Sequence, residues 1–166
     1  MSSTWCKKNV SGAAGLEGLS KVVRNFYDKH CESGKEGFGW TAYKDYRKRM
    51  FDSCKRYDEK DLRNFIPCNA RATNKYQHKN AMAYCCNFNI QPALRFFMNE
   101  AGIRFDADQY ALSSFLQWLW RSRIRQGKPV TVFIPAPRIR SLFLQWLGYS
   151  VDEIEDKWKT RYIPLN

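Results

Sequence analysis

Residues 106–148 read DADQYALSSFLQWLWRSRIRQGKPVTVFIPAPRIRSLFLQWLG and predict a helix, a strand and a second helix in succession. The central part, Pro129–Pro135, is rich in β-branched residues and bounded by prolines, which is typical of a short strand. The segment Ala136–Gly148 has a proline near its start and ends in glycine, the usual boundaries of a helix. Strand and helix in alternation favour an α/β fold with a parallel sheet.

The first part of this stretch, Asp106–Gly127, predicts a helix that begins at a capping signature. Asp106 is the expected N-cap, Gln109 follows three residues later, and the glycine at the end is a typical C-cap. At 100° per residue, four apolar side chains fall in one stripe that we expect to face the core: Leu112, Phe115, Leu116 and Leu119.

The opposite side of this predicted helix carries a row of polar and basic residues, Gln117, Arg121 and Arg125, with no acid nearby. Arginine offers a planar, permanently charged fork that suits phosphate oxygens. We therefore expect this row to bind phosphate. The alternative is an ordinary solvated helix face, which normally carries charges of both signs.

The remaining sequence predicts further helices and one more strand. We expect a helix at 16–32, a charged helix at 41–61, a buried strand at 62–68, and helices at 78–87 and 92–101. We also expect three parts: an N-terminal helical segment (1–37), an α/β domain (38–150) and a C-terminal tail (151–166).

Composition limits the class of protein. A chain of 166 residues with 44% hydrophobic content is long and apolar enough to fold around a core. It has neither an apolar run of membrane-spanning length nor an N-terminal signal sequence, so we expect no membrane contact and a place in the cytoplasm of a bacterial host cell. Six cysteines without a C-x-x-C pair and two histidines predict reduced thiols and no metal site.

The net charge of +12 is concentrated in the second half of the chain. Residues 62–151 contain twelve Lys and Arg but three acids, and no acid occurs at 62–99 or 109–151. A solvated surface usually mixes the two signs, so these acid-free stretches indicate a polyanionic partner. A generally basic protein is the alternative interpretation.

Two further groups of residues are candidate phosphate ligands. The loop at 69–75 follows the strand expected at 62–68, and loops that bind ligands in open α/β sheets follow the strands; its candidates are Asn69, Arg71, Thr73, Asn74 and Lys75. Arg138 and Arg140 begin the helix after Pro135, where a bound phosphate would be favoured. An ordinary polar turn and plain surface arginines are the alternatives.

Aromatic side chains lie close to these basic residues. Trp118, Trp120, Phe143 and Trp146 have the size and shape to stack on bases. Their helical spacing favours a place in the core instead.

Three segments resemble a known family: GWTAYKDYRK (39–48), NFIPCNARATNKY (64–76) and the run from YALSSF to LFLQWL (110–147). They resemble the second RecA-like domain of phage- and plasmid-encoded DEAD/DEAH helicases of superfamily 2, over residues 38–148. The resemblance implies that 69–74 is motif V, and that 117–125 is motif VI with Arg121 and Arg125 as arginine fingers on the γ-phosphate of ATP. It also implies a strand around 39–43.

The phosphate-cradling half of such a motor is missing from the sequence. No G-x-x-x-x-G-K-[ST] motif occurs. The acidic run Asp58–Asp61 follows charged residues rather than an apolar strand, so we interpret it as a helix end. We therefore expect no complete catalytic site and no ATPase activity from this chain alone; ATP and Mg²⁺ enter only if a P-loop partner domain supplies the rest.

Two functions remain open. The chain is either the nucleic-acid-binding half of a mobile-element helicase, with DNA favoured over RNA, that supplies arginines to an ATP site in trans, or a stand-alone phage or mobile-element protein that occupies a nucleic-acid enzyme and inhibits it. A nuclease that holds Mg²⁺ on Asp106 and Asp108 is a third, weaker hypothesis, because a helix N-cap already explains both acids.

Overall fold

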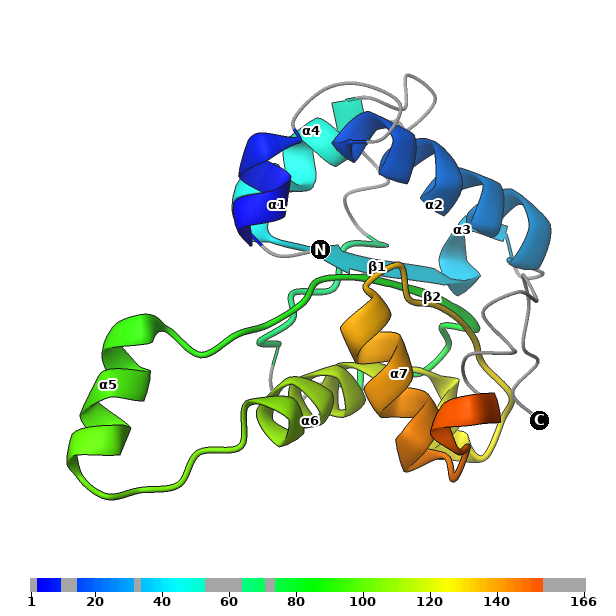
Figure 1. Ribbon diagram of the computed structural model, residues 1–166. Helices are drawn as coiled ribbons and strands as arrows, with labels where there is room; N and C mark the ends of the chain where they lie inside the picture. The colour runs from blue at the N-terminus through cyan, green and yellow to red at the C-terminus, as the bar shows by residue number, and fades with distance from the viewer. Residues whose placement is uncertain (1–2, 10–14, 32–33, 53–63, 71–73, 154–166) are drawn as a thin grey trace.

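The computed structural model describes residues 3–9, 15–31, 34–52, 64–70 and 74–153. Three parallel strands form one sheet in the order β1-β2-β3: β1 (Phe38–Ala42), β2 (Ala81–Cys85) and β3 (Thr131–Phe133). Helices cover both faces of the sheet (Figure 1). The predicted α/β fold with a short parallel sheet and flanking helices is confirmed.

The helices lie in two layers. One face of the sheet carries the N-terminal helices and α4, and the other carries α6 and α7 (Figure 1). Their bounds are α1 (Ser3–Lys8), α2 (Leu16–His30), α3 (Gly34–Gly37), η1 (Lys44–Tyr46), α4 (Arg47–Asp52), α5 (Pro92–Glu100), α6 (Ala107–Leu119), η3 (Arg123–Gln126) and α7 (Pro137–Trp146).

Strand β2 separates two hydrophobic cores because its side chains alternate between the faces of the sheet. On one side Ala81, Ala83 and Cys85 pack with α1, α2 and α4; on the other Met82 and Tyr84 pack with α6 and α7. All five residues are buried. The helix predicted at 78–87 is therefore wrong: a strand buried on both faces is a continuous apolar run, and over so few residues it resembles a buried helix.

The strand predicted at 62–68 is also wrong over the described residues. Phe65 alone forms a parallel bridge, to Trp40 at the free edge of β1. The Ile66 side chain packs over Gly39, where a Cβ atom would come within 2.8 Å of the Ile66 Cδ1 atom. Pairing with β1 is limited to this bridge and to the bond from the Ile66 N–H to the Trp40 carbonyl at 2.8 Å among the described residues.

The helix predicted at 41–61 begins later than expected. Residues 38–42 form β1, the strand that the helicase resemblance implies, and α4 starts at Arg47. Residues 53–61 lie outside the described part of the chain. Elsewhere the helices expected near 16–32, 92–101 and 136–148 and the strand at 129–135 are confirmed as α2, α5, α7 and β3.

The helix predicted at 106–127 is confirmed at its start and wrong at its end. The Asp106 side chain accepts hydrogen bonds from the N–H groups of Asp108 and Gln109, at 2.8 and 2.9 Å. However, α6 stops at Leu119, a turn follows, and η3 ends at Gly127, whose φ of 69° is the left-handed conformation that favours glycine. The apolar stripe of α6 does face the core, with Phe115 and Leu119 fully buried.

Residues 87–106 form an arm that leaves the body of the domain (Figure 1). Helix α5 stands at its tip, and Pro92 is its first residue. Four large apolar side chains of the arm are between 49% and 68% exposed: Leu94, Phe96, Phe97 and Ile103.

The N-terminal helices pack directly on the sheet. The Phe26 ring of α2 stacks on that of Phe133 in β3 with centroids 5.5 Å apart. The division of the chain at residues 37 and 150 stays a prediction. Among the described residues, no helix is long and apolar enough to cross a membrane.

Candidate nucleic-acid interface

The three residues predicted on one helical face, Gln117, Arg121 and Arg125, lie in three different elements of the fold. Gln117 belongs to α6, where its amide Nε2 donates to the Ser113 hydroxyl at 3.3 Å. Arg121 lies in the turn after that helix, and Arg125 lies in η3. The row is therefore not a single helix face, because the helix ends two residues before Arg121.

The structure nevertheless brings both arginines together with the predicted loop. The Arg125 Nη1 atom donates to the Asn74 Oδ1 atom at 2.7 Å, across 51 residues of sequence. Burial and the nearby charge of Arg125 lower the pKa of Arg121. Tyr76 also lies close enough to Arg121 to affect its pKa, which it raises.

Arg121 has an incomplete set of hydrogen bonds. Only 9% of the residue is exposed, yet its Nε atom has no partner within the described part of the chain. A buried donor without an acceptor costs about 1–3 kcal/mol. An anion at this position would supply the missing acceptor.

This group lies at the amino ends of the strands. The Arg123 N–H donates to the Lys79 carbonyl at 3.1 Å, and the Thr131 N–H donates to that of Asn80 at 2.9 Å, just before β2 and β3 begin. We name the six residues gathered here the amino-edge cluster: Asn74, Lys75, Lys79, Arg121, Arg123 and Arg125. A loop that follows a strand begins at the carboxyl edge of the sheet, which is where we expected Asn74. Asn74 lies at the opposite, amino edge.

Lys79 and Arg123 are the two members of the cluster that the sequence did not suggest, and Lys79 is the buried one. It is 3% exposed, and its ammonium group donates to the Glu36 carbonyl and the Asn64 side chain, both at 2.8 Å. Burial lowers the pKa of this lysine. Both hydrogen-bond acceptors are neutral, but the charge of Glu36 also acts on the ammonium group and offsets part of its positive potential.

One acid acts on the cluster, because the charge of Glu36 raises the pKa of Lys79 against the effect of burial. In the described part of the chain, no ion pair joins Arg121, Arg123 or Arg125 to a carboxylate; the ion pairs found there involve Lys21, Arg24 and Arg138. Of the other predicted ligands, Asn69 is exposed in a turn, whereas Arg71 and Thr73 lie outside the described residues.

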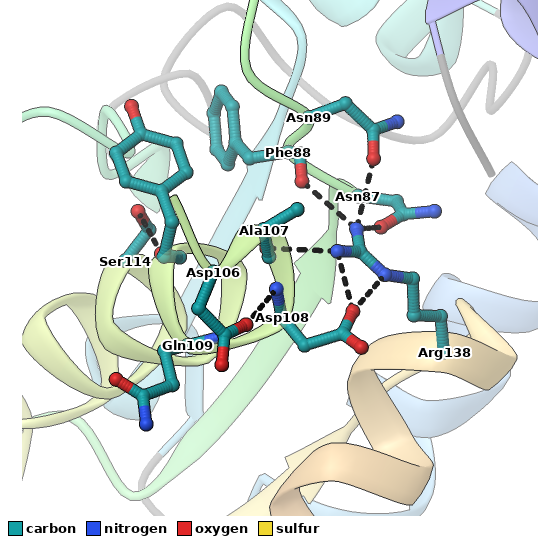
Figure 2. Close-up of polar contacts among 10 residues, drawn as sticks. Asn87, Phe88, Asn89, Asp106, Ala107, Asp108, Gln109, Ser114 and Arg138 are labelled. Carbon is teal, nitrogen blue, oxygen red and sulfur yellow. Dashed lines mark hydrogen bonds and ion pairs between the residues drawn. The ribbon is translucent and has the colours of Figure 1, made fainter. Parts of the chain in front are cut away.

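Arg138 has a different environment at the opposite, carboxyl edge of the sheet. Figure 2 shows its guanidinium enclosed by the two ends of the arm. It pairs with the Asp108 carboxylate at 2.6 Å and donates to the carbonyls of Ala107 and Phe88 at 2.8 and 3.1 Å. It also donates to the side chains of Asn87 and Asn89 at 3.2 and 2.9 Å.

The acceptors around Arg138 therefore fix the base of the arm rather than leave the guanidinium free for a phosphate. Arg140 is half-buried and donates to the Ile134 carbonyl at 3.4 Å. Asp106 caps α6 and Asp108 pairs with Arg138, so both acids of the nuclease hypothesis have structural partners. The described residues contain no group of three or more His, Cys, Asp or Glu suited to a metal ion.

Replacing Arg138 with lysine is expected to destabilise the domain by about 1–2 kcal/mol. An ammonium group cannot reproduce the planar fork that reaches both ends of the arm, although partial exposure limits the loss. Urea denaturation measures the change. Arg95→Lys on the exposed α5 is the matched control and should stay within about 0.5 kcal/mol; an equal effect of both substitutions would contradict the assignment of Arg138 as the anchor of the arm.

The four aromatic candidates divide into two groups. Trp118 and Phe143 are core residues, as the helical spacing favoured. Trp120 and Trp146 are 39% and 49% exposed and meet edge to face, with centroids 5.9 Å apart.

Comparison with known proteins places the chain in a family. A family model described as the YonV C-terminal Rossmann-like domain matches residues 1–147. The SPbeta prophage-derived uncharacterized protein YonV of Bacillus subtilis (strain 168) is 34% identical over 129 residues, which are 78% of this chain and 30% of that protein. The chain therefore spans less than a third of that relative's length. No solved structure matches it. With its three-stranded parallel sheet between two layers of helices, the chain belongs to the family of YonV C-terminal Rossmann-like domains.

Proposed function

We propose that this chain binds nucleic acid, with DNA preferred to RNA, through the amino-edge cluster. The observation that carries the proposal is Arg121, a nearly buried arginine beside a second arginine, with an unpartnered Nε atom and no acid paired to it among the described residues. Two guanidinium groups held together without a carboxylate repel each other. A phosphate between them removes that repulsion and accepts hydrogen bonds from both.

The cluster is also suited to a phosphate backbone because its parts are fixed. Asn74 holds Arg125 through one nitrogen and leaves the other donors of that guanidinium available. The backbone bond from Arg123 to Lys79 ties η3 to the segment before β2. A preorganised cationic surface loses little entropy when it binds.

A salt titration of DNA binding tests the proposal. Fluorescence anisotropy of labelled single-stranded DNA, double-stranded DNA and RNA gives Kd for the whole chain between about 50 and 200 mM salt. Contact of three or more cations with phosphates predicts a slope of log K against log salt of about −2 or steeper. Binding that is absent at low salt, or insensitive to salt, would rule out this function.

A finer proposal concerns the wider protein: the chain acts as the motor half of a mobile-element helicase and supplies Arg121 or Arg125 to an ATP site in trans. The resemblance of 69–74 and 117–125 to helicase motifs V and VI supports it, as does the pairing of Asn74 with Arg125. The relative YonV is described as prophage-derived and extends well beyond the matched region. ATP and Mg²⁺ would then bind between this chain and a P-loop partner.

An ATPase assay on a mixture of two separate chains tests this finer proposal. The part of YonV outside the matched region, produced as a separate chain, is added to this protein in the presence of DNA and ATP. ATP hydrolysis that requires both chains, and that Arg121→Ala or Arg125→Ala abolishes, is the expected result. If neither the separate chains nor their mixture hydrolyse ATP, the helicase role is excluded. The proposal that this chain binds DNA is not affected by that result.

The second candidate function is the capture and inhibition of a nucleic-acid enzyme. The arm supports it, because exposed apolar side chains on a projecting helix are suited to a protein partner. Phe97→Asp on α5 separates the two candidates. It should leave DNA affinity unchanged if the cluster binds DNA, and it should abolish capture of a partner enzyme if the arm is the binding surface.

A further inference from the structure

Two cysteine thiols meet at the carboxyl edge of the sheet. The Sγ atoms of Cys68 and Cys86 are 3.3 Å apart, although the residues are separated by 18 positions in sequence. Cys86 follows β2 directly, and Cys68 lies in the turn after Pro67. The Thr41 hydroxyl lies 2.9 Å from the Cys68 sulfur. Both cysteines are free thiols in this structure.

The two sulfurs have different environments. Cys68 is half-buried, whereas Cys86 is fully buried. Hydrogen bonds from Cys86 and Thr41 lower the pKa of Cys68, and burial raises that of Cys86. A half-buried sulfur that favours the thiolate, in contact with a second thiol, is an arrangement in which oxidation can end in a disulfide.

We propose that Cys68 and Cys86 form a reversible redox site that hydrogen peroxide converts to an intramolecular disulfide. The Cys68 thiolate attacks the peroxide, takes one oxygen as sulfenic acid and releases hydroxide, which the proton lost from Cys68 converts to water. The Cys86 sulfur then attacks the Cys68 sulfur; the S–S bond forms as the S–O bond breaks, and the oxygen leaves with the Cys86 proton as a second water. The two thiols lose two electrons and the peroxide gains them.

Closure of the disulfide needs a short movement. A disulfide has a sulfur separation of about 2.05 Å, so the sulfurs must approach by roughly 1 Å. The turn that carries Cys68 is partly exposed and has room to adjust. The bond would also join this turn to the residue before Asn87, which accepts from Tyr43 and Arg138 at the base of the arm.

Peroxide treatment of the full chain, followed by alkylation under denaturing conditions, tests the proposal. The number of thiols that react should fall from six to four. Trypsin should release NFIPCNAR (64–71) cross-linked to NAMAYCCNFNIQPALR (80–95), and fragmentation should place the bond on Cys86. The oxidised protein should melt about 5–10 °C higher, because the bond closes a loop in the unfolded chain. Dithiothreitol should reverse both changes.

Single substitutions distinguish the pair from other cysteines. Cys85→Ala removes the adjacent thiol that faces the opposite core and should leave the cross-link intact. Cys86→Ala should abolish the cross-link and leave Cys68 to oxidise to sulfinic acid. Six alkylated thiols after peroxide, or a bond that joins Cys31 or Cys85 instead, would overturn the proposal.

Discussion

Replacing Trp118 with alanine is expected to cost about 3–5 kcal/mol of folding free energy, a large part of the about 5–15 kcal/mol that stabilises a typical domain. Trp118 is fully buried in the core between the sheet and α6, against Tyr84 with ring centroids 5.1 Å apart. Its indole N–H also donates to the Ile66 carbonyl at 3.1 Å. The substitution therefore opens a cavity and leaves a buried carbonyl without its partner.

Urea denaturation measures this loss, and two variants divide it into parts. Trp118→Phe keeps most of the apolar volume but removes the N–H, so its cost should be smaller, about 1–3 kcal/mol. Trp146→Ala removes a half-exposed tryptophan from α7 and should cost about 1 kcal/mol. Similar losses for Trp118→Ala and Trp146→Ala would show that the segment that contains Ile66 does not depend on Trp118.

Removing Arg121 and Arg125 together should weaken DNA binding about 10- to 100-fold near 100 mM salt, to a similar extent for all sequences. Phosphate contacts position a duplex but do not select its bases, so the loss should not depend on base composition. Anisotropy with two oligonucleotides of unrelated sequence measures the effect. Melting temperatures of both proteins check that the double variant folds.

The matched control removes two charges elsewhere. Lys7 and Lys8 are exposed on α1, which covers the face of the sheet opposite α6 (Figure 1). Lys7→Ala/Lys8→Ala lowers the net charge by the same amount, and we expect less than a threefold change in Kd. An equal loss from both double variants would indicate that only the total charge matters, and not the amino-edge cluster.

The elements with clear end signals could be predicted from the sequence. Pro92 and Pro137 begin α5 and α7, and Asp106 caps α6, because each residue acts on backbone groups within one helical turn. Strand β2 could not be identified, since its type depends on neighbours that bury both of its faces. That error also concealed Lys79, which stands just before β2 and reaches Asn64.

The sequence suggested four of the six residues of the amino-edge cluster, but neither Lys79 and Arg123 nor the geometry of the cluster. An uninterrupted helix would have put Gln117, Arg121 and Arg125 on one face, whereas the end of α6 at Leu119 sends the chain to the amino edge. The contact between Arg125 and Asn74 spans distant segments and depends on the tertiary fold. Local sequence likewise gives no indication that Arg138 holds the base of the arm.

The most direct test is the salt dependence of DNA affinity, measured side by side for the natural chain and for Arg121→Ala/Arg125→Ala. Each arginine that contacts a phosphate contributes about 0.9 to the slope of log K against log salt. Binding through the amino-edge cluster predicts that the variant's slope is shallower by about one to two. Two parallel lines, with the same slope for both proteins, would contradict it.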